Sequence, residues 1–338
     1  MDIDVLVIGE ALIDIVEGSD GDRELVGGSP ANVAVGVARQ RHAVQLLTRL
    51  GRDERGFRIA DELAASLVRI VPESWTDAPT STARARLRSD GSAEYEFAIA
   101  WGAPVVALGE AGVAATAGAG AGAVGVAGVG DAGVASGAGT AAGSGSLAIG
   151  PVRAVHTGSI ALFLEPGGTA VLDTLRGAAG RVLVSVDPNI RPALVGDHAT
   201  AVARFADAAA SADLVKLSDE DAAWLYPGLG AAEVLERIAG YGPRLAVMTR
   251  GADGAVGLGP GGIVEVAPHV VTVADTIGAG DAYMASLISS ALDEPAVFTD
   301  GDAFAAALHR AAVMAGITVS RAGANPPTRA ELAALGLP

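Results

Sequence analysis

Short apolar runs alternate with amphipathic stretches along most of the chain. Because each run is almost continuously apolar, it should be buried on both faces, as are strands of a parallel sheet that helices cover on both sides. The runs are IDVLVIG (3–9), AVQLLTRL (43–50), RAVHTGS (153–159), RVLVSVD (181–187), DLVKLS (213–218) and RLAVMTR (244–250). Helical periodicity follows over 30–41, 54–67, 168–180, 200–211 and 219–225. The pattern predicts an α/β fold, a three-layer αβα sandwich with a mostly parallel central sheet.

One segment departs from this alternation. The stretch TARARLRSDGSAEYEFAI (82–99) alternates apolar and polar residues on either side of Asp90 and Gly91, which is typical of a hairpin with one wet face. Together with ALIDIVEG (11–18), it predicts a small β-sheet outside the main one, built from about 11–26 and 82–100. Periodicity alone leaves two interpretations open, a lid over a ligand or a plain surface hairpin.

A second segment, 102–150, is largely Ala, Gly and Val, with Glu110 and Asp131 as its only charges. Such a stretch has few large side chains to bury and much backbone entropy to lose, so we expect a loosely packed insertion within a single domain that spans 1–338. The uncharged run 111–130 has the length of a membrane span, but seven glycines and the lack of Leu, Ile and Phe argue against one. GAGAVG (120–125) fits GxGxxG without a strand before it, and we interpret it as a chance match.

Charge and composition narrow the function. The chain has 39 acidic and 23 basic residues, a net charge of −16, which disfavours nucleic acid and anionic membranes as partners. There is no cysteine, which excludes disulfides, thiolate metal sites and thiol nucleophiles. Lys216, the only lysine, follows no glycine-rich loop, which excludes a Walker-type NTPase. The five histidines show no metal-binding spacing. The start MDIDVLVIGE lacks the basic region of a signal peptide, and we expect a cytoplasmic protein.

The stretch DTIGAGDAYMA (275–285) carries the strongest chemical signal. It places Gly278, Ala279 and Gly280 directly before the apolar stripe of a helix. The first turn of a helix has amide N–H groups without partners and about half a positive charge, and small residues let a phosphate approach those amides. Asp281 then stands beside the phosphate.

Asp281 has two interpretations. It could complement the helix dipole, or it could take the proton from an attacking hydroxyl, which typically contributes a factor of about 10² to 10⁴ in rate. An ordinary aspartate can do so if the proton leaves late, as in a loose phosphoryl-transfer transition state. The preceding Asp275, Thr276 and small residues favour the general base.

GGSPAN (27–32) has the features of a second tight strand-to-helix turn. Ser29 is a suitable N-cap and Pro30 fits the first helical position, which places Gly27 and Gly28 in the approach to the helix. An ordinary turn with no ligand is the alternative.

Taken together, DTIGAGDAY (275–283) and GGSPANVAVGVARQ (27–40) resemble the paired signatures of the PfkB (ribokinase-like) carbohydrate kinases. The resemblance covers nearly the whole chain outside 102–150. Within that family DPNIRPAL (187–194), VKLSDEDAAWL (215–225) and SRAGANPP (320–327) are most similar to bacterial fructokinases.

The resemblance implies a site residue by residue. Asp281 is the catalytic base, and the amides of Gly278, Ala279 and Gly280 form the anion hole. Contacts to the sugar come from Asp14, Gly27, Gly28 and Asn32, and Arg191 approaches the phosphates or the substrate. Contacts in the nucleotide region come from Ser218, Asp221, Thr249, Gly251 and Asn325. Ser218 and Asp221 stand where many members carry Asn and, three residues on, Glu near Mg²⁺ and the phosphates. Asp275 and the Ile277 carbonyl match a monovalent-cation site, with K⁺ as the candidate ion.

The predicted function is therefore ATP- and Mg²⁺-dependent phosphorylation of a primary hydroxyl of a small sugar, with fructose as the first candidate. A 2-keto-3-deoxygluconate kinase, or another PfkB sugar kinase, is the alternative, with Arg86, Arg88 and Arg191 as candidate partners for a sugar-acid carboxylate. A sugar- or nucleotide-binding protein without activity is the alternative from a different class. The apolar face of the lid could pair two chains in a homodimer.

Overall fold

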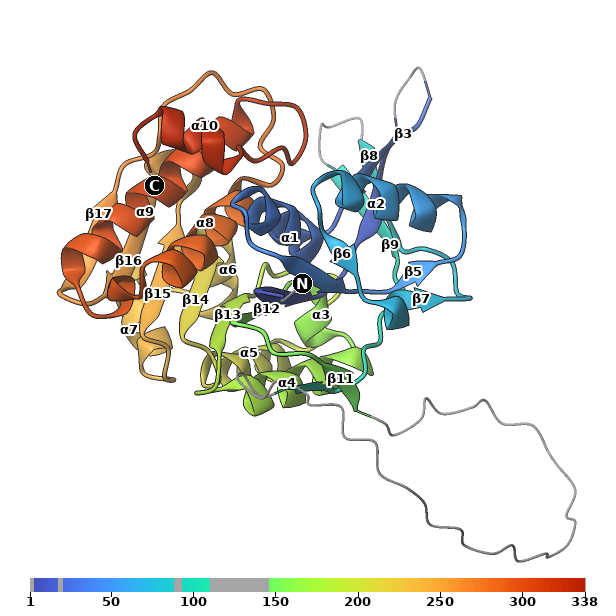
Figure 1. The fold of residues 1–338 in the computed structure, drawn as a ribbon, viewed down its shortest axis with the longest axis horizontal. Coiled ribbons are helices and arrows are strands. Elements are labelled where there is room, and N and C mark those ends of the chain that lie inside the picture. Colours follow the sequence, from blue (N-terminus) through green and yellow to red (C-terminus); the bar gives the residue numbers. More distant parts are fainter. Residues whose placement is uncertain (1–2, 18–20, 88–92, 110–145, 338) are drawn as a thin grey trace, which may run out of the picture.

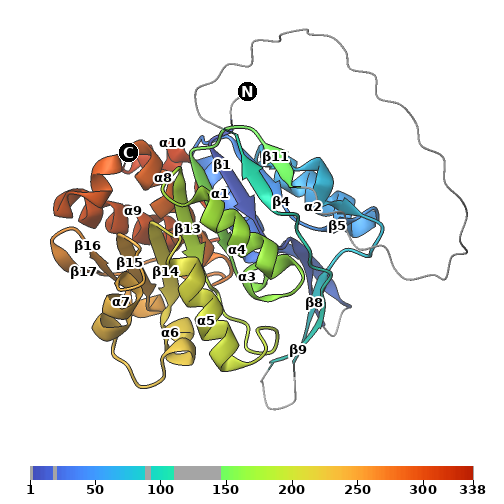
Figure 2. The same ribbon diagram turned by 90° about the horizontal axis from the view of Figure 1, so that it is seen from below.

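A nine-stranded sheet forms the middle layer of the molecule, and helices cover both of its faces (Figures 1 and 2). The computed structural model describes residues 3–17, 21–87, 93–109 and 146–337. Neighbouring strands from β15 to β6 are parallel, and β16 alone runs against the rest. The predicted three-layer α/β sandwich is confirmed. In spatial order the strands are β17 (Gly262–Val266), β16 (Ala255–Gly259), β15 (Leu245–Thr249), β14 (Leu214–Ser218), β13 (Leu183–Asp187), β12 (Ala154–Gly158), β1 (Val5–Ile8), β4 (Val44–Leu47) and β6 (Arg69–Ile70).

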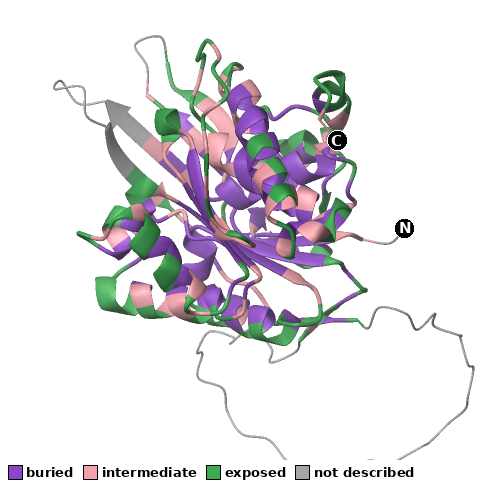
Figure 3. Ribbon diagram, turned by 90° about the vertical axis from the view of Figure 1, so that its left-hand side faces the viewer, coloured by how far each residue is buried: buried purple, intermediate pink, exposed green. Residues whose placement is uncertain are grey.

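Two hydrophobic cores lie on opposite faces of this sheet, and single strands contribute to both. In β1, Val5 and Val7 pack into one core and Leu6 and Ile8 into the other, as the two-residue period of a strand requires. Figure 3 shows the buried strands between helices whose outer faces are exposed. The first core includes residues of α1 (Ser29–Arg39), α2 (Glu54–Ala65), α8 (Ala279–Asp293), α9 (Gly301–Val319) and α10 (Arg329–Ala334). The second includes residues of α3 (Ile160–Phe163), α4 (Gly167–Ala178), α5 (His198–Ala209), α6 (Asp219–Leu225) and α7 (Ala231–Ala239).

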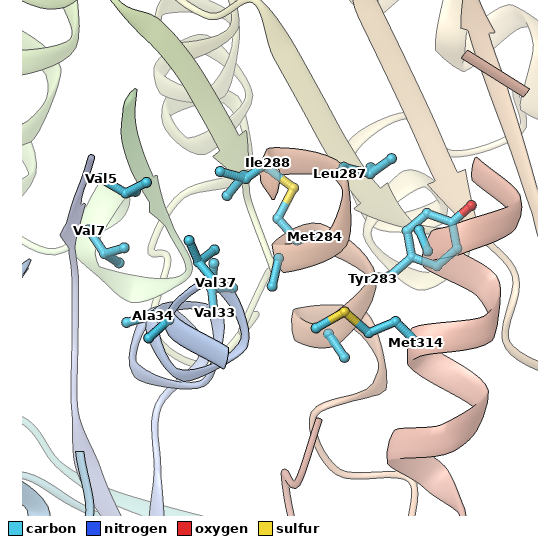
Figure 4. Close-up of a cluster of buried hydrophobic side chains, with 14 of the residues drawn as sticks. Val5, Val7, Val33, Ala34, Val37, Tyr283, Met284, Leu287, Ile288 and Met314 are labelled. Atoms are coloured by element: carbon cyan, nitrogen blue, oxygen red, sulfur yellow. The ribbon is translucent and has the colours of Figure 1, made fainter. Parts of the chain in front are cut away.

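Helices α1 and α8 pack side by side, although they come from opposite ends of the sequence. Val33 and Val37 of α1 lie near Met284 and Ile288 of α8 within the first core (Figure 4). The helices approach closely at Gly36, where an added Cβ would lie 2.5 Å from the Ala285 Cβ. Only glycine fits at this point without displacing one helix.

A four-stranded sheet projects from the sandwich at the predicted position. Its order is β3 (Arg23–Gly27), β2 (Leu12–Val16), β8 (Thr82–Leu87) and β9 (Ala93–Ala98), with β2 and β8 parallel and the outer pairs antiparallel. Figure 1 shows it extending away from the main sheet beside α2. Arg84 forms ion pairs with Glu17 and Asp22. The predicted turn at Asp90 and Gly91 lies outside the described residues.

The single strand predicted over 43–50 is divided in the structure. β4 ends at Leu47, and Leu50–Gly51 forms β5, which pairs with β7 (Trp75–Thr76) in a separate two-stranded sheet. The break is explained by the Ser74 side chain. Its hydroxyl accepts the Thr48 N–H, so this N–H is not available to a neighbouring strand.

The two ends of the Ala/Gly-rich segment form regular structure. β10 (Val106–Leu108) pairs in parallel with β11 (Leu147–Ile149), and the Val106 N–H donates to the Thr174 hydroxyl of α4 at 2.9 Å. These ends carry Val, Leu and Ile side chains that reach the second core. The run 111–130 and the motif at 120–125 lie outside the described residues.

Within the part of the chain that the structure describes, α9 alone has the length and hydropathy of a candidate membrane span. Its apolar window is 56% buried inside the molecule, and Phe304, Leu308 and Met314 belong to the first core. A core helix of a folded domain gives the same signal.

We expect Gly36→Ala to destabilise the protein, because the new methyl group overlaps Ala285. Overpacking typically costs about 1 to 3 kcal/mol, more than the helix propensity that alanine gains. The matched control is Gly177→Ala in α4, where no atom lies within 4 Å of the added Cβ. That change should leave stability equal or raise it by up to about 1 kcal/mol. Urea unfolding of both variants measures this, and equal effects would show that the α1–α8 contact is not tight.

Candidate active site

Asp281 lies in the first turn of α8, and both oxygens of its carboxylate accept hydrogen bonds from α1. The Ser29 hydroxyl donates to Oδ1 at 2.6 Å, and the Asn32 side-chain amide donates to Oδ2 at 2.8 Å. These bonds join positions 252 and 249 apart in sequence. The two glycine-rich motifs of the sequence therefore meet at one carboxylate.

This arrangement corrects one expectation from the sequence. Ser29 was expected to cap α1, but Gly28 occupies the N-cap position and no side chain caps the helix. The Ser29 hydroxyl is directed to Asp281 instead. Asn32, expected to contact the sugar, also donates to Asp281. Gly28 has a φ of 107°, and a Cβ there would lie 2.5 Å from the Glu10 carbonyl oxygen, so the turn needs a glycine.

The start of α8 presents backbone amides with few partners. Gly278 is the N-cap, in the left-handed region with φ 77°. Of the four peptide N–H groups from 278 to 281, only that of Ala279 donates to an acceptor within the described residues, the Thr276 carbonyl at a long 3.4 Å. Gly278, Ala279, Gly280 and Asp281 are all partly exposed. These amides, at the positive end of the helix dipole, are suited to an anion.

Asp275 fixes the loop before α8. Its Oδ1 accepts the Ile277 N–H at 3.0 Å, and its Oδ2 accepts the Gly323 N–H at 2.9 Å. The carboxylate thus ties the approach to the anion site to the loop after α9, and a Cβ on Gly278 would meet Ala324 of that loop at 2.6 Å. The monovalent-cation site of Asp275 and the Ile277 carbonyl stays a prediction.

The side-chain carboxylate of Asp14 in β2 lies against the backbone of Gly27 in β3. A Cβ on Gly27 would lie 1.9 Å from the Asp14 Oδ2, so only glycine leaves room for this carboxylate. Burial raises the pKa of Asp14 to about 6, and the positive charge of Arg191 partly offsets the effect. Arg191 is exposed, and its guanidinium donates to the Asn189 side chain at 2.8 Å. Asp14 therefore lies within electrostatic reach of Arg191.

Glu10 is a further candidate site residue, which the sequence analysis missed. Its side chain is 5% exposed, and its Oε2 has no hydrogen-bond partner among the described residues. Burial raises its pKa to about 8, and a hydrogen bond from Ser159 and the charge of Arg191 act in the opposite direction. At neutral pH the group is mostly a neutral carboxylic acid. The available signal was an acid directly after the first buried strand, where ligands of such folds bind.

Lys216 and Asp187 form a buried ion pair that the sequence analysis also missed. The Lys216 Nζ lies 2.7 Å from the Asp187 Oδ2 and donates to the Gly280 carbonyl at 3.2 Å. Their side chains are 5% and 1% exposed. The pair lies under the start of α8.

Ser218 and Asp221 form a capping box at the start of α6. The Ser218 hydroxyl accepts the Asp221 N–H, and the Asp221 Oδ2 accepts the Ser218 N–H at 2.9 Å. The Asp221 Oδ1 accepts the Ile190 N–H at 2.6 Å. Both carboxylate oxygens are therefore engaged, and among the described residues no group of three acids or histidines is arranged to hold a metal.

The remaining nucleotide candidates fall at the ends of neighbouring elements. Thr249 pairs with Ser218 in the register of β14 and β15, which brings these two side chains to the same edge of the sheet. Gly251 begins the turn after β15 with φ 52°. The Asn325 side chain accepts a hydrogen bond from Arg39, and its N–H donates to the carbonyl of Gly323, the residue whose N–H donates to Asp275. Arg88 and the side chain of Arg86 lie outside the described part of the chain.

The chain belongs to the PfkB family of carbohydrate kinases. Residues 2–116 and 136–331 match the family described as "pfkB family carbohydrate kinase". This confirms the resemblance inferred from the motifs and makes the protein an ATP-dependent carbohydrate kinase.

Several of the similar proteins are fructokinases. One from Rhizobium leguminosarum bv. trifolii is 32% identical over 294 residues, which cover 85% of this chain and 79% of that protein. The structure of a fructokinase with bound ATP from Xylella fastidiosa matches with a TM-score of 0.76 at 23% identity, over 98% of this chain and 97% of that one. A double mutant of a Vibrio cholerae fructokinase, bound to fructose, ADP and potassium ion, matches with a TM-score of 0.75 at 23% identity, over 98% and 97%.

We expect Glu10→Gln to change how stability depends on pH. The pKa of Glu10 rises from 4.5 to about 8 on folding, so between these values the unfolded chain has released a proton that the folded one retains. This part of the stability is therefore lost as the pH rises, and Gln has no such loss. The melting temperature of the variant, relative to wild type, should increase from about pH 5 to about pH 8.5.

Glu236→Gln, an exposed change on α7, is the control and should leave the pH dependence as in wild type. Parallel melting curves of wild type and Glu10→Gln at every pH would contradict the burial of an uncharged Glu10.

Proposed function

We propose that the protein transfers the terminal phosphoryl group of ATP to a primary hydroxyl of fructose. The observation that carries this proposal is the Asp281 carboxylate, held by Ser29 and Asn32 beside partly exposed amides at the start of α8. The fructokinase relative at 32% identity supports the choice of sugar.

In this proposal Asp281 is the general base. The hydroxyl oxygen of the sugar forms a bond to the terminal phosphorus, the bond from that phosphorus to the bridging oxygen of ADP breaks, and the hydroxyl proton passes to the Asp281 carboxylate. The two hydrogen bonds from α1 fix the orientation of the carboxylate. Ordered placement of a base and an acceptor is the larger part of catalysis in a loose phosphoryl transfer.

The amides of Gly278, Ala279 and Gly280 take the negative charge of the group in transfer. Their alignment is set before the reaction, because Gly278 holds the left-handed turn and Asp275 ties the loop to Gly323. Preorganised donors of this kind typically contribute a factor of about 10² to 10³ each. They also offset the repulsion between the phosphoryl group and Asp281.

The sugar is placed by Asp14, Gly27, Gly28 and Asn32 at the base of the four-stranded sheet. We propose that this sheet is a lid, whose closure keeps water from the phosphoryl group. Asn32 would then share its amide between Asp281 and a sugar hydroxyl. Arg191 lies near Asp14 and Glu10 and contacts the substrate or the phosphates.

Ser218, Thr249 and Gly251, at the ends of β14 and β15, and Asn325 are the residues that would contact ATP. Mg²⁺ bound with the nucleotide would neutralise phosphate charge, and Asp221 is the predicted protein residue that would help to hold it. K⁺ at Asp275 and the Ile277 carbonyl is proposed as an organiser of the anion site. The cytoplasmic location, the lack of nucleic-acid and membrane partners and a homodimer through the lid, where Val16 is exposed, stay predictions.

A second candidate substrate is 2-keto-3-deoxygluconate. The observation that favours it is Arg191, a cation beside the predicted sugar residues that could pair with a sugar-acid carboxylate. The buried acids Asp14 and Glu10 near the same arginine reduce the free positive charge and favour a neutral sugar.

We expect turnover with fructose to exceed that with ribose, 2-keto-3-deoxygluconate and a nucleoside. A coupled assay that follows ADP release across these four acceptors at equal concentration measures the preference. A higher kcat/KM with the sugar acid would replace the first candidate by the second. Calorimetric binding of sugar and nucleotide without turnover on any acceptor would favour a binding protein.

We expect Asp281→Asn to lower kcat by about 10² to 10⁴, because the variant cannot accept the proton. The affinity for ADP, measured by calorimetry, should change by less than about threefold. The matched control is Asp302→Asn, the same change in the exposed first turn of α9, where only a dipole contribution of up to about 1 kcal/mol is at stake. Equal kcat values in the two variants would remove the base assignment.

A further inference from the structure

Four polar side chains interrupt the apolar strands on one face of the central sheet. His156 in β12, Ser185 and Asp187 in β13 and Lys216 in β14 are all buried. Their immediate neighbours Val184, Val186, Val215 and Leu217 pack into the second core, so these polar residues face the opposite side, which carries α1 and α8. The sheet therefore presents a buried polar patch toward the start of α8.

Lys216 is the part of this patch that reaches α8. Its Nζ donates to the Gly280 carbonyl at 3.2 Å and pairs with the Asp187 Oδ2 at 2.7 Å. A Cβ on Gly280 would lie 3.0 Å from the same Nζ, which makes the ammonium a direct neighbour of the anion-site backbone. It is the only lysine among 338 residues.

Stability does not account for this pair. Removing two charges from water costs several kcal/mol each, and a buried ion pair is often no more stable than apolar residues of the same volume. Here the Asp187 Oδ1 also lacks a partner within the described residues. An apolar pair would fill the space between β13, β14 and α8 at no greater cost.

Both groups are charged at neutral pH. Burial by itself lowers the pKa of Lys216, but the Asp187 carboxylate outweighs this, and the pKa of Lys216 is raised above its ordinary value. Burial raises the pKa of Asp187 to about 6, which leaves it ionised at pH 7. The ammonium is thus a fixed positive charge under the first turn of α8.

The hydrogen bond from Lys216 acts on a peptide unit of the anion site. The Gly280 carbonyl and the Asp281 N–H belong to the same peptide group, so a charged donor on the oxygen holds the plane of that group. It also makes the N–H a stronger donor, as in hydrogen-bond chains.

We propose that Lys216, anchored by Asp187, is a positioning residue that fixes the Gly280–Asp281 peptide, adds the Asp281 N–H to the anion hole of Gly278, Ala279 and Gly280, and so strengthens the binding of the transferred phosphoryl group. This inference rests on the proposed kinase function. Lys216 touches neither the sugar nor the phosphoryl group in this account. Its effect should therefore appear in kcat and in recognition of the terminal phosphate, and little in the KM of the sugar.

The test compares Lys216→Met, Asp187→Asn and the double variant. Lys216→Met should lower kcat by roughly 10- to 100-fold, somewhat less than the loss of a direct oxyanion donor, with the sugar KM within about threefold. It should also reduce the preference for AMP-PNP over ADP in calorimetric binding. The double variant leaves neither charge unpaired, so the urea concentration at its unfolding midpoint should be at least as high as that of either single variant. Its kcat should stay at the level of Lys216→Met.

Arg310→Met is the control for the loss of a buried cation away from the anion site. The Arg310 guanidinium donates to Ser286 of α8 and to Gln40. This variant should lose stability but keep the AMP-PNP preference and kcat of its folded fraction.

Two outcomes would overturn the inference: a wild-type kcat in Lys216→Met, or a double variant that regains wild-type kcat together with stability, which would make the pair structural only. The proposed function could fail separately. If the wild-type protein phosphorylates none of the sugars but Lys216→Met still reduces the preference for AMP-PNP, the proposed function is refuted and the role of Lys216 at the anion site remains.

Discussion

The contact between α1 and α8 is the interaction on which the rest of the site depends. It brings Ser29 and Asn32 to the Asp281 carboxylate, and it is possible only because Gly36 lets the two helices approach at Ala285. Without that approach Asp281, the proposed base, would lose both donors that orient its carboxylate. The proposed anion site at the start of α8 would also shift relative to the predicted sugar residues that precede α1. Core packing and catalytic geometry are thus set by the same helix pair.

The electrostatics of the site are local. The chain carries a net charge of −16, yet the start of α8 combines exposed amides, a helix dipole and the Lys216 ammonium directly behind them. At physiological salt, screening reduces the interaction between exposed charges beyond about 8 Å. Burial keeps Glu10 largely uncharged, which lowers the negative charge near Asp281 further. An acidic protein can therefore hold an anionic phosphate at this point.

The sequence predicted the layers of the fold and the two motifs well, because buried parallel strands and glycine-rich helix starts leave local patterns. Other features depend on which elements become neighbours. The sequence predicts Ser29 as a helix cap, and only the packing of α1 on α8 shows that its hydroxyl donates to Asp281. From the sequence, Lys216 excludes a P-loop but shows no contact with the anion site. That contact exists only because β13, β14 and α8 lie together in the fold. The division of 43–50 into β4 and β5 depends on Ser74, which follows more than twenty residues later.

The most direct test of this account is a crystal structure of the protein with ADP, aluminium fluoride and fructose. The account predicts the fluoroaluminate within about 3 Å of the amide nitrogens of Gly278 to Gly280, and one primary hydroxyl of fructose between it and the Asp281 carboxylate. A fluoroaluminate bound away from the start of α8, or a fructose whose hydroxyls all lie beyond hydrogen-bond reach of Asp281, would contradict it.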